Sequence, residues 1–215
     1  MSLILDLLFP KFCLQCHKPG SYFCSDCFNQ QIINSPKISS SNSNYEGSLS
    51  VFKYNSLIRS LITEIKYGFV TDIINPFVDI SVFIIKNNFP HILNYWRQNN
   101  FVIVPIPLHH YRQNWRGFNQ SVLIGQLLAS KLGLSFSNQI IYRTKNTHIQ
   151  AKLANRQDKK INLENAFICS NQSIPKNIIL FDDVSTTFST LKSAYSTISS
   201  YDAPTHCWFL TLAGS

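Results

Sequence analysis

Short apolar runs alternate with longer amphipathic segments along the chain. Residues 101–104 and 178–181 are continuous apolar runs, which predict strands buried on both faces of a parallel sheet, and residues 48–54 and 206–212 are also predicted as strands. Between the runs, apolar residues recur every three or four positions, which predicts helices with one buried face. Strands and helices therefore alternate, and this order is typical of an α/β domain with a mainly parallel sheet.

The predicted helices have recognisable ends. One follows Asn55, which can cap it, and ends at Gly68. Another spans residues 118–132 and has Gly133 at its C-terminal end. A third lies within residues 72–88. The fourth is indicated by an apolar face made of Leu191, Ala194, Tyr195 and Ile198.

Composition divides the chain into a short N-terminal module and one main domain. Residues 1–34 hold four of the six cysteines, and residues 35–50 are rich in Ser and Asn, which predicts a linker. The main domain then covers residues 51–215. A chain of 215 residues, of which 45% are apolar, is long enough for one ordinary core plus a small appendage.

The apolar segments predict neither export nor membrane insertion. The N-terminal run has no basic segment before it, is broken by Asp6 and lacks a small-residue cleavage site. Residues 73–85 are interrupted by Pro76 and Asp79, and are shorter than the about 20 residues that cross a bilayer. We therefore expect a cytoplasmic protein.

Two C-x2-C pairs, separated by seven residues, lie in the N-terminal module: Cys13, Cys16, Cys24 and Cys27. Four thiolates at this spacing can close the tetrahedral coordination of one zinc ion, and a closed site of this kind is structural. Two disulfides are the alternative, which a reducing cytoplasm disfavours. His17 is an alternative ligand, although the four cysteines already complete the coordination of the metal.

Two carboxylates, Asp182 and Asp183, follow the predicted strand at residues 178–181, at the strand end where open α/β sheets bind ligands. A hydroxyl-rich turn then opens a helix, whose N-terminal N–H groups suit a phosphate. The carboxylates suit vicinal sugar hydroxyls. The alternative is an ordinary N-cap cluster, but a cap needs one such residue rather than several. The candidate phosphate-binding residues are Thr186, Thr187, Ser189 and Thr190.

A second loop follows the strand at residues 101–104 and carries arginines. It begins with Pro105-Ile106-Pro107 and contains Arg112 and Arg116. The carboxyl ends of parallel strands meet at one edge of the sheet, so we expect both anion-binding loops to lie there.

The formal charge of +8, from 19 Lys and Arg against 11 Asp and Glu, favours an anionic partner. Basic and aromatic residues are mixed along the chain, as in proteins that track single-stranded nucleic acid and stack on its bases. A solvated basic face above core aromatics is the alternative. The candidate nucleic-acid contacts are Lys66, Arg143, Lys145, Lys152 and Arg156.

The strand, the two acidic residues and the Thr-rich loop resemble the phosphoribosyltransferase motif for phosphoribosyl pyrophosphate. Phe188 stands where that family usually has Gly, a residue that permits positive φ. The whole chain more specifically resembles the ComF/ComFC competence family. The shared features, in order, are the four-cysteine module, a Val-Pro-x-Pro strand end, an Arg-Gly-Phe-Asn-Gln loop and the Thr-rich loop.

The resemblance extends to Arg143, Thr144, Gln150, Leu153, Arg156, Asn162 and Ala166-Phe167, and so covers nearly the whole chain. It implies a type I phosphoribosyltransferase-like domain. In that fold Asp182 and Asp183 would hold the ribose, and the hydroxyl-rich loop would hold the 5′-phosphate. The loop with Arg112, Arg116 and Asn119 would hold the pyrophosphate with magnesium.

The resemblance also implies a role in natural transformation, with single-stranded DNA and competence DNA-processing proteins as partners. A phosphoribosyltransferase activity is one expectation, for which the sequence identifies no acceptor. A catalytically degenerate, zinc-dependent factor that binds nucleic acid or another protein is the alternative.

Overall fold

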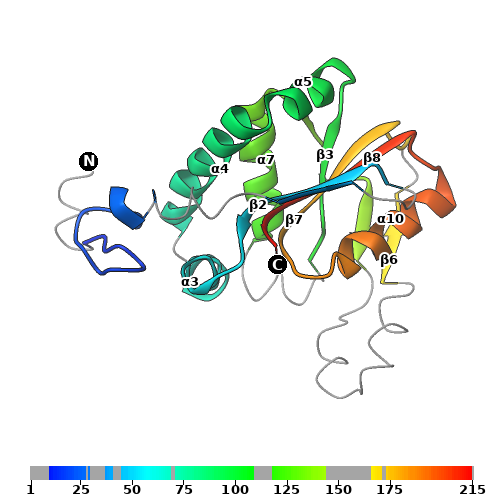
Figure 1. The fold of residues 1–215 in the computed structure, drawn as a ribbon. Helices are drawn as coiled ribbons and strands as arrows, with labels where there is room; N and C mark the ends of the chain where they lie inside the picture. The colour runs from blue at the N-terminus through cyan, green and yellow to red at the C-terminus, as the bar shows by residue number, and fades with distance from the viewer. Residues whose placement is uncertain are drawn as a thin grey trace.

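The computed structural model describes residues 10–27, 29, 37–40, 45–68, 71–108, 118–143, 166–170 and 173–214. Within these residues, six strands form one sheet in the order β1-β2-β8-β7-β3-β4 (Figure 1). All neighbouring pairs are parallel except β1 and β2. The strands are β1 (Lys37–Ser40), β2 (Gly47–Lys53), β3 (Val102–Pro105), β4 (Ser135–Phe136), β7 (Asn177–Ser185) and β8 (His206–Gly214).

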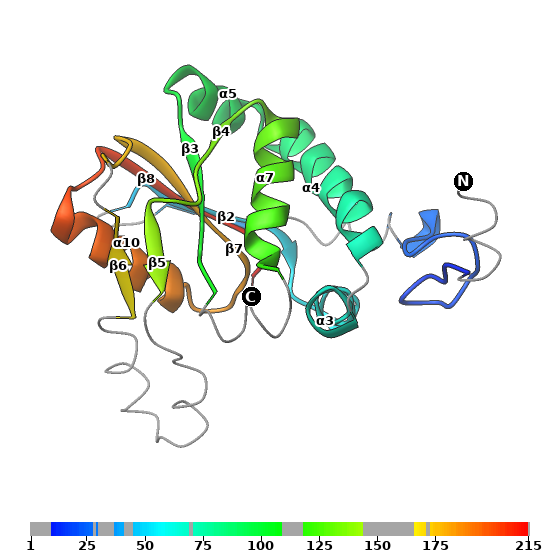
Figure 2. The same ribbon diagram turned by 180° about the vertical axis from the view of Figure 1, so that it is seen from behind.

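A small antiparallel pair, β5 and β6, stands apart from this sheet, close to α10 (Figure 2). Its strands are β5 (Ile141–Arg143) and β6 (Phe167–Cys169). The α-helices are α3 (Ser56–Thr63), α4 (Ile74–Asn88), α5 (Pro90–Gln98), α7 (Gln120–Leu132) and α10 (Ser189–Tyr201). A π-helix, η1 (Glu64–Gly68), and a 3-10 turn, η2 (Thr71–Ile73), lie between α3 and α4.

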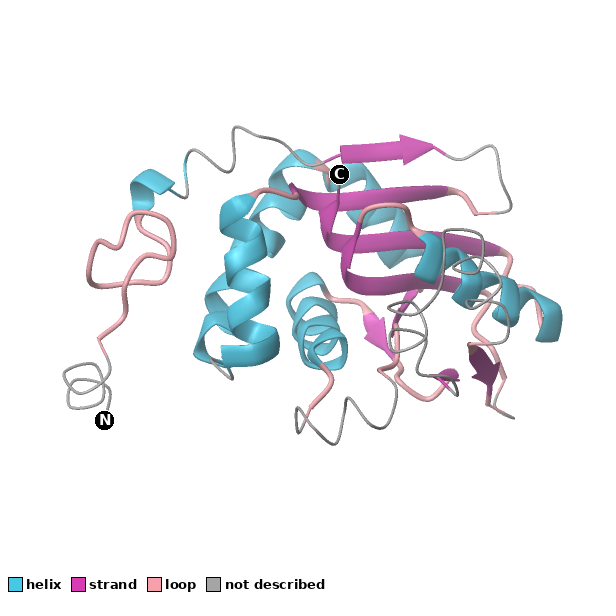
Figure 3. Ribbon diagram, turned by 90° about the horizontal axis from the view of Figure 1, so that it is seen from below, coloured by secondary structure: helices cyan, strands magenta, loops and turns pink. Residues whose placement is uncertain are grey.

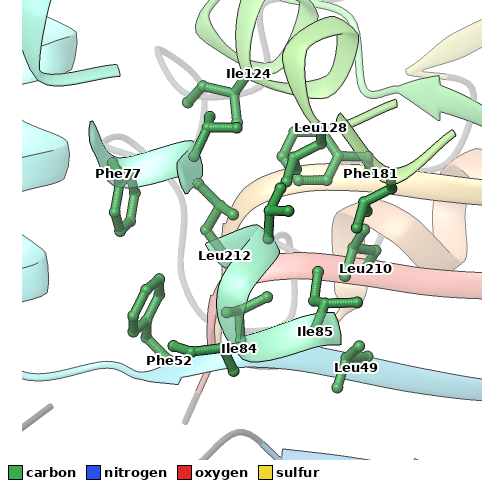
Figure 4. Close-up of a cluster of buried hydrophobic side chains, with 14 of the residues drawn as sticks. Leu49, Phe52, Phe77, Ile84, Ile85, Ile124, Leu128, Phe181, Leu210 and Leu212 are labelled. Carbon is green, nitrogen blue, oxygen red and sulfur yellow. The ribbon is translucent and has the colours of Figure 1, made fainter. Parts of the chain in front are cut away.

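Helices cover both faces of the sheet because successive residues of β7 point to opposite sides. Ile179 and Phe181 pack into one cluster with α4 and α7, while Ile178 and Leu180 pack into a second cluster with α10. Figure 3 shows the strands side by side with helices packed around them. Figure 4 shows the first cluster, in which Phe181 lies among side chains from the neighbouring strands and from α4 and α7. The predicted α/β class with a mainly parallel sheet is confirmed.

Local signals place the helix ends as expected. The side chain of Asn55 accepts a hydrogen bond of 2.9 Å from the backbone N–H of Ile58 and so caps α3. Gly133 ends α7 in the left-handed region, with φ of 66°. The helix α5 was not predicted. Its start at Pro90 fits the preference of proline for the first turn.

The segment at residues 35–50, expected as a linker, contributes to the sheet instead. It contains β1 and the first residues of β2. Ser50 is buried, and its hydroxyl lies 2.9 Å from that of Thr211 on β8. Polar residues can pair here because backbone hydrogen bonds hold strands together and the buried hydroxyls bond one another. The strand predicted at residues 48–54 corresponds to β2, whereas a composition typical of linkers hid β1.

The N-terminal module contacts the main domain beside α4 (Figure 1). The ring of Phe23 stacks on that of Phe77, a fully buried residue of α4, with centroids 6.3 Å apart. Leu14 and Tyr22 pack against the same core cluster. Across the described residues, every helix is too short or too polar to span a membrane.

Phe188 adopts the backbone conformation that glycine favours. Its φ is 55° and its ψ is 14°, in the left-handed region, where it serves as the N-cap residue of α10. Its N–H donates a 2.8 Å hydrogen bond to Ser185 Oγ, and its ring stacks 6.1 Å from that of Phe209. The turn therefore keeps the backbone shape that glycine would allow, at a steric cost of about 1 to 2 kcal/mol for a residue with a Cβ.

This conformation predicts an inverted order of stability for two substitutions. Phe188→Ala and Phe188→Gly both remove the ring, but only glycine relieves the strain, so the glycine variant should be more stable by about 1 kcal/mol in denaturant unfolding. Ser196, exposed within α10, is the control, since there alanine should be more stable than glycine by a similar amount. An alanine variant that is the more stable at position 188 would contradict the assignment.

Candidate functional site

The two acidic residues lie where the central strands of the sheet end. Asp182 and Asp183 belong to the last part of β7, and Phe181 pairs with Pro105, the last residue of β3. A cavity of about 290 Å³ lies at this edge. It is lined by Lys66, Tyr67, Ile106, Pro107, Leu108, Gln120, Arg143, Asp182, Asp183, Val184 and Thr190.

Asp183 is almost fully buried and forms three polar contacts. Its Oδ2 lies 2.7 Å from Lys66 Nζ in an ion pair, and it accepts a 3.3 Å hydrogen bond from Gln120 Nε2. Its Oδ1 accepts a 2.9 Å hydrogen bond from the N–H of Val184. Because a buried charge needs a partner, the ammonium of Lys66 offsets part of the desolvation cost of this carboxylate.

Asp182 is held by weaker contacts and is partly exposed. Its Oδ1 accepts hydrogen bonds from Ser121 Oγ at 3.2 Å and from the N–H of Asp183 at 2.9 Å. Burial, and then the neighbouring Asp183 carboxylate, raise the pKa of Asp182 to about 7, although Lys66 acts in the opposite direction. A carboxyl group whose ionisation is disfavoured by its surroundings, beside a cavity, is typical of a ligand site.

The hydroxyl-rich loop leads into α10, a helix of 13 residues. Thr190 lines the cavity, whereas Thr186, Thr187 and Ser189 are exposed to solvent. Thr187 Oγ1 and Ser189 Oγ are 3.1 Å apart. The loop thus presents hydroxyls and the N-terminus of a helix beside the carboxylates, which suits an anionic group attached to a sugar.

Lys66 and Arg143, predicted as nucleic-acid contacts, both line the cavity with the acidic pair. The guanidinium of Arg143 also lies 5.3 Å from the centroid of the Phe167 ring. Asn119 is buried at the start of α7, where it donates to Ile106 O and accepts from the N–H of Ser121. It therefore holds the loop after β3 to α7, and it lines a neighbouring cavity of about 480 Å³.

The remaining predicted residues, Arg112, Arg116, Lys145, Lys152 and Arg156, lie outside the described residues. Gln120 and Ser121 were not proposed as site residues, yet both bond to the acidic pair. Gln120 is the last residue of the Arg-Gly-Phe-Asn-Gln motif and Ser121 directly follows it, so their position in and beside that motif was the available signal.

The four cysteines of the N-terminal module lie together. Their sulfur atoms are all within 4.8 Å of one another, and those of Cys16 and Cys24 are 3.5 Å apart. Sulfurs around one zinc ion, with Zn–S of about 2.3 Å, would be about 3.8 Å apart. Burial would raise the pKa of Cys13, but backbone N–H groups of Cys16 and Cys24 lower it to about 6. His17 is not part of the cluster, and all six cysteines are free thiols.

No family model matches the chain, but comparison with characterised proteins finds relatives that are named for competence or DNA utilization. The chain is 41% identical over 92 residues to Competence protein F of Haemophilus influenzae, which covers 41% of this chain and 40% of that protein. It is 31% identical over 147 residues to Competence protein ComFC of Bacillus subtilis, which covers 67% of this chain and 55% of that protein. The DNA utilization protein YhgH of Salmonella typhi is 42% identical over 89 residues, covering 41% of this chain and 39% of that protein.

Among solved structures, adenine phosphoribosyl transferase from Trypanosoma brucei aligns with 78% of this chain and 83% of its own length. The TM-score is 0.40 and the sequence identity is 13%. The alignments with the competence and DNA utilization proteins span about two fifths to just over half of their own length. These sequence relationships confirm the resemblance, and the chain belongs to the ComF/ComFC family.

Proposed function

We propose that the chain binds phosphoribosyl pyrophosphate with magnesium at the edge where β3 and β7 end. The observation that carries this proposal is the meeting of Asp182, Asp183, Lys66 and Thr190 around one cavity. In this proposal the carboxylates accept hydrogen bonds from the ribose hydroxyls. The loop of Thr186, Thr187, Ser189 and Thr190 donates to the 5′-phosphate at the start of α10.

Magnesium would neutralise charge on the pyrophosphate, and the loop with Arg112 and Arg116 would contact the same group. Departure of pyrophosphate from C1′ leaves positive charge on the sugar, so carboxylates beneath the ribose and cations around the leaving group are the electrostatics that a transfer reaction needs. The proposal therefore includes phosphoribosyl transfer to an acceptor, or use of the same site to sense the ligand.

The names of the relatives favour a biological role in DNA uptake. Competence protein F, ComFC and YhgH are named for competence or DNA utilization. We propose that this chain handles imported single-stranded DNA in the cytoplasm, together with competence DNA-processing proteins. Two exposed tyrosines support a nucleic-acid surface. Tyr67 follows Lys66 and Tyr142 precedes Arg143, and their side chains are 53% and 46% exposed.

We also propose that the cluster of Cys13, Cys16, Cys24 and Cys27 holds a structural zinc ion. Four sulfurs at these distances match a closed tetrahedral site, which leaves no position for a reacting water. The ion would supply the order that a segment of this size cannot obtain from a core of its own. It would also keep Phe23 stacked on Phe77 and thereby couple the module to α4.

The phosphoribosyl site is tested by calorimetric titration of the zinc-loaded protein with phosphoribosyl pyrophosphate and magnesium. Asp182→Asn and Asp183→Asn should each weaken binding at least tenfold, because each removes a charged acceptor for a ribose hydroxyl. Wild-type protein that is folded but does not bind would refute the proposal.

The stability of the Asp182→Asn variant, measured against pH, shows whether a loss of binding comes from unfolding. Because the folded-state pKa of Asp182 is raised to about 7, its ionisation costs stability as the pH rises from about 4 to about 7. The asparagine variant should therefore be at least as stable as wild type at pH 8, and equally stable below pH 4. Loss of binding in that variant would then report the missing carboxylate rather than unfolding.

DNA binding is tested with a fluorescent oligothymidine. Affinity should fall as salt rises, because phosphate contacts release counterions, and Tyr142→Ala should weaken binding by roughly five- to a hundredfold through loss of a stacking platform. Tyr201→Ala is the matched control, since Tyr201 is also exposed but lies at the opposite end of α10 from the site. Equal loss in both variants, or affinity that salt leaves unchanged, would argue against this surface.

The zinc proposal predicts about one zinc ion per folded chain by elemental analysis. Cys24→Ser should abolish zinc retention and lower the unfolding temperature by roughly 5 °C or more, because the metal contributes free energy only to the folded state. Cys169→Ser, outside the cluster, should keep the metal. A Cys24→Ser variant that retains a full equivalent of zinc would exclude this site.

A further inference from the structure

Lys66 already occupies one of the carboxylates that the proposed ligand needs. It lies in η1, and its Nζ is 2.7 Å from Asp183 Oδ2, with the lysine side chain 21% exposed and that of the aspartate 5% exposed. A π-helix such as η1 is rare and often marks a functional position. Lys66 therefore contacts the buried Asp183 and also lines the cavity.

Most of the hydrogen-bond acceptor positions of the Asp183 carboxylate are occupied when Lys66 is paired with it. An ionised carboxylate offers about four lone-pair positions. Three are taken by the N–H of Val184, by Gln120 Nε2 and by Lys66 Nζ. The last two share Oδ2, so a ribose hydroxyl could bind that oxygen well only if one of them moved away.

Lys66 is better suited to move than Gln120. The side chain of Gln120 is buried at the start of α7, whereas Lys66 is partly exposed on a flexible four-carbon chain. Its ammonium carries three rotatable donors and can follow a phosphate oxygen as a point charge. Moreover, a polyanion that enters a cavity with two carboxylates is favoured by a cation there, and Lys66 lines this cavity and forms an ion pair with Asp183.

We propose that Lys66 is an exchangeable counterion. In the free protein it pairs with Asp183, and on binding it moves to a pyrophosphate oxygen of phosphoribosyl pyrophosphate, which leaves Asp183 Oδ2 to accept a ribose hydroxyl. Lys66 therefore selects for ligands that carry an anionic group at C1′. This inference rests on the proposed function and assigns Lys66 to the small ligand rather than to DNA.

The test compares two ligands that differ only at C1′. Wild type and Lys66→Met are titrated with phosphoribosyl pyrophosphate and with ribose 5-phosphate, both with saturating magnesium. Lys66→Met should bind phosphoribosyl pyrophosphate at least tenfold more weakly. It should bind ribose 5-phosphate as well as wild type or more tightly, because Asp183 is no longer occupied.

Three further variants separate this role from a structural one. Lys66→Gln repeats the neutralisation with a polar side chain and serves if the methionine variant does not fold. Lys66→Arg keeps the charge and should retain most of the preference for phosphoribosyl pyrophosphate. Lys131→Met removes a surface lysine paired with Asp79 at 2.6 Å and should leave both affinities unchanged.

Each outcome decides the point. A loss of preference for phosphoribosyl pyrophosphate in both neutral variants supports the exchange. Equal weakening of binding for the two ligands would show that Lys66 only holds Asp183 in place. Unchanged affinities would show that Lys66 has no part in binding. Either result overturns the inference, while the proposed function stands. Wild type that binds neither ligand would overturn the proposed function and this inference together.

Discussion

Parallel pairing of β7 with both β3 and β8 is the constraint on which the rest of the structure depends. It buries Ile178 to Phe181 on both faces, so that α7 and α10 must cover opposite sides of one strand. It also brings the ends of β7 and β3 to the same edge. The acidic pair, the loop after β3 and the start of α10 then share one cavity because the strands that carry them end together.

The site is a balance between burial and charge. Asp182 is partly exposed and Asp183 is almost fully buried, so their carboxyl groups need polar partners in place of water. Lys66 forms an ion pair with Asp183, while burial and the neighbouring Asp183 carboxylate raise the pKa of Asp182. Carboxyl groups with a raised pKa are more frequent at functional sites, where proteins give up some stability for function.

The N-terminal module is organised around its cysteine cluster rather than around a hydrophobic core. Its residues are too few to form a core, and its buried residues include three of the four cysteines. Backbone N–H groups that favour a thiolate at Cys13 prepare the cluster for a cation, and Phe23 attaches the module to α4. The module thus combines a cluster of sulfur atoms with an aromatic contact to the main domain.

The sequence by itself determined the features that depend on residues close together along the chain. Runs of apolar residues gave β7, β8 and β3, the Asn55 cap and Gly133 gave helix ends, and cysteine spacing gave a cluster. Tertiary structure decided what depends on long-range pairing. The residues of β1 and the start of β2 are strands because they pair with neighbouring strands. Phe188 has a positive φ, and its ring stacks on that of Phe209. Lys66 forms its ion pair with Asp183 from a helix that is distant in sequence. No local pattern specifies such contacts, since each is stabilised by residues that only folding brings near.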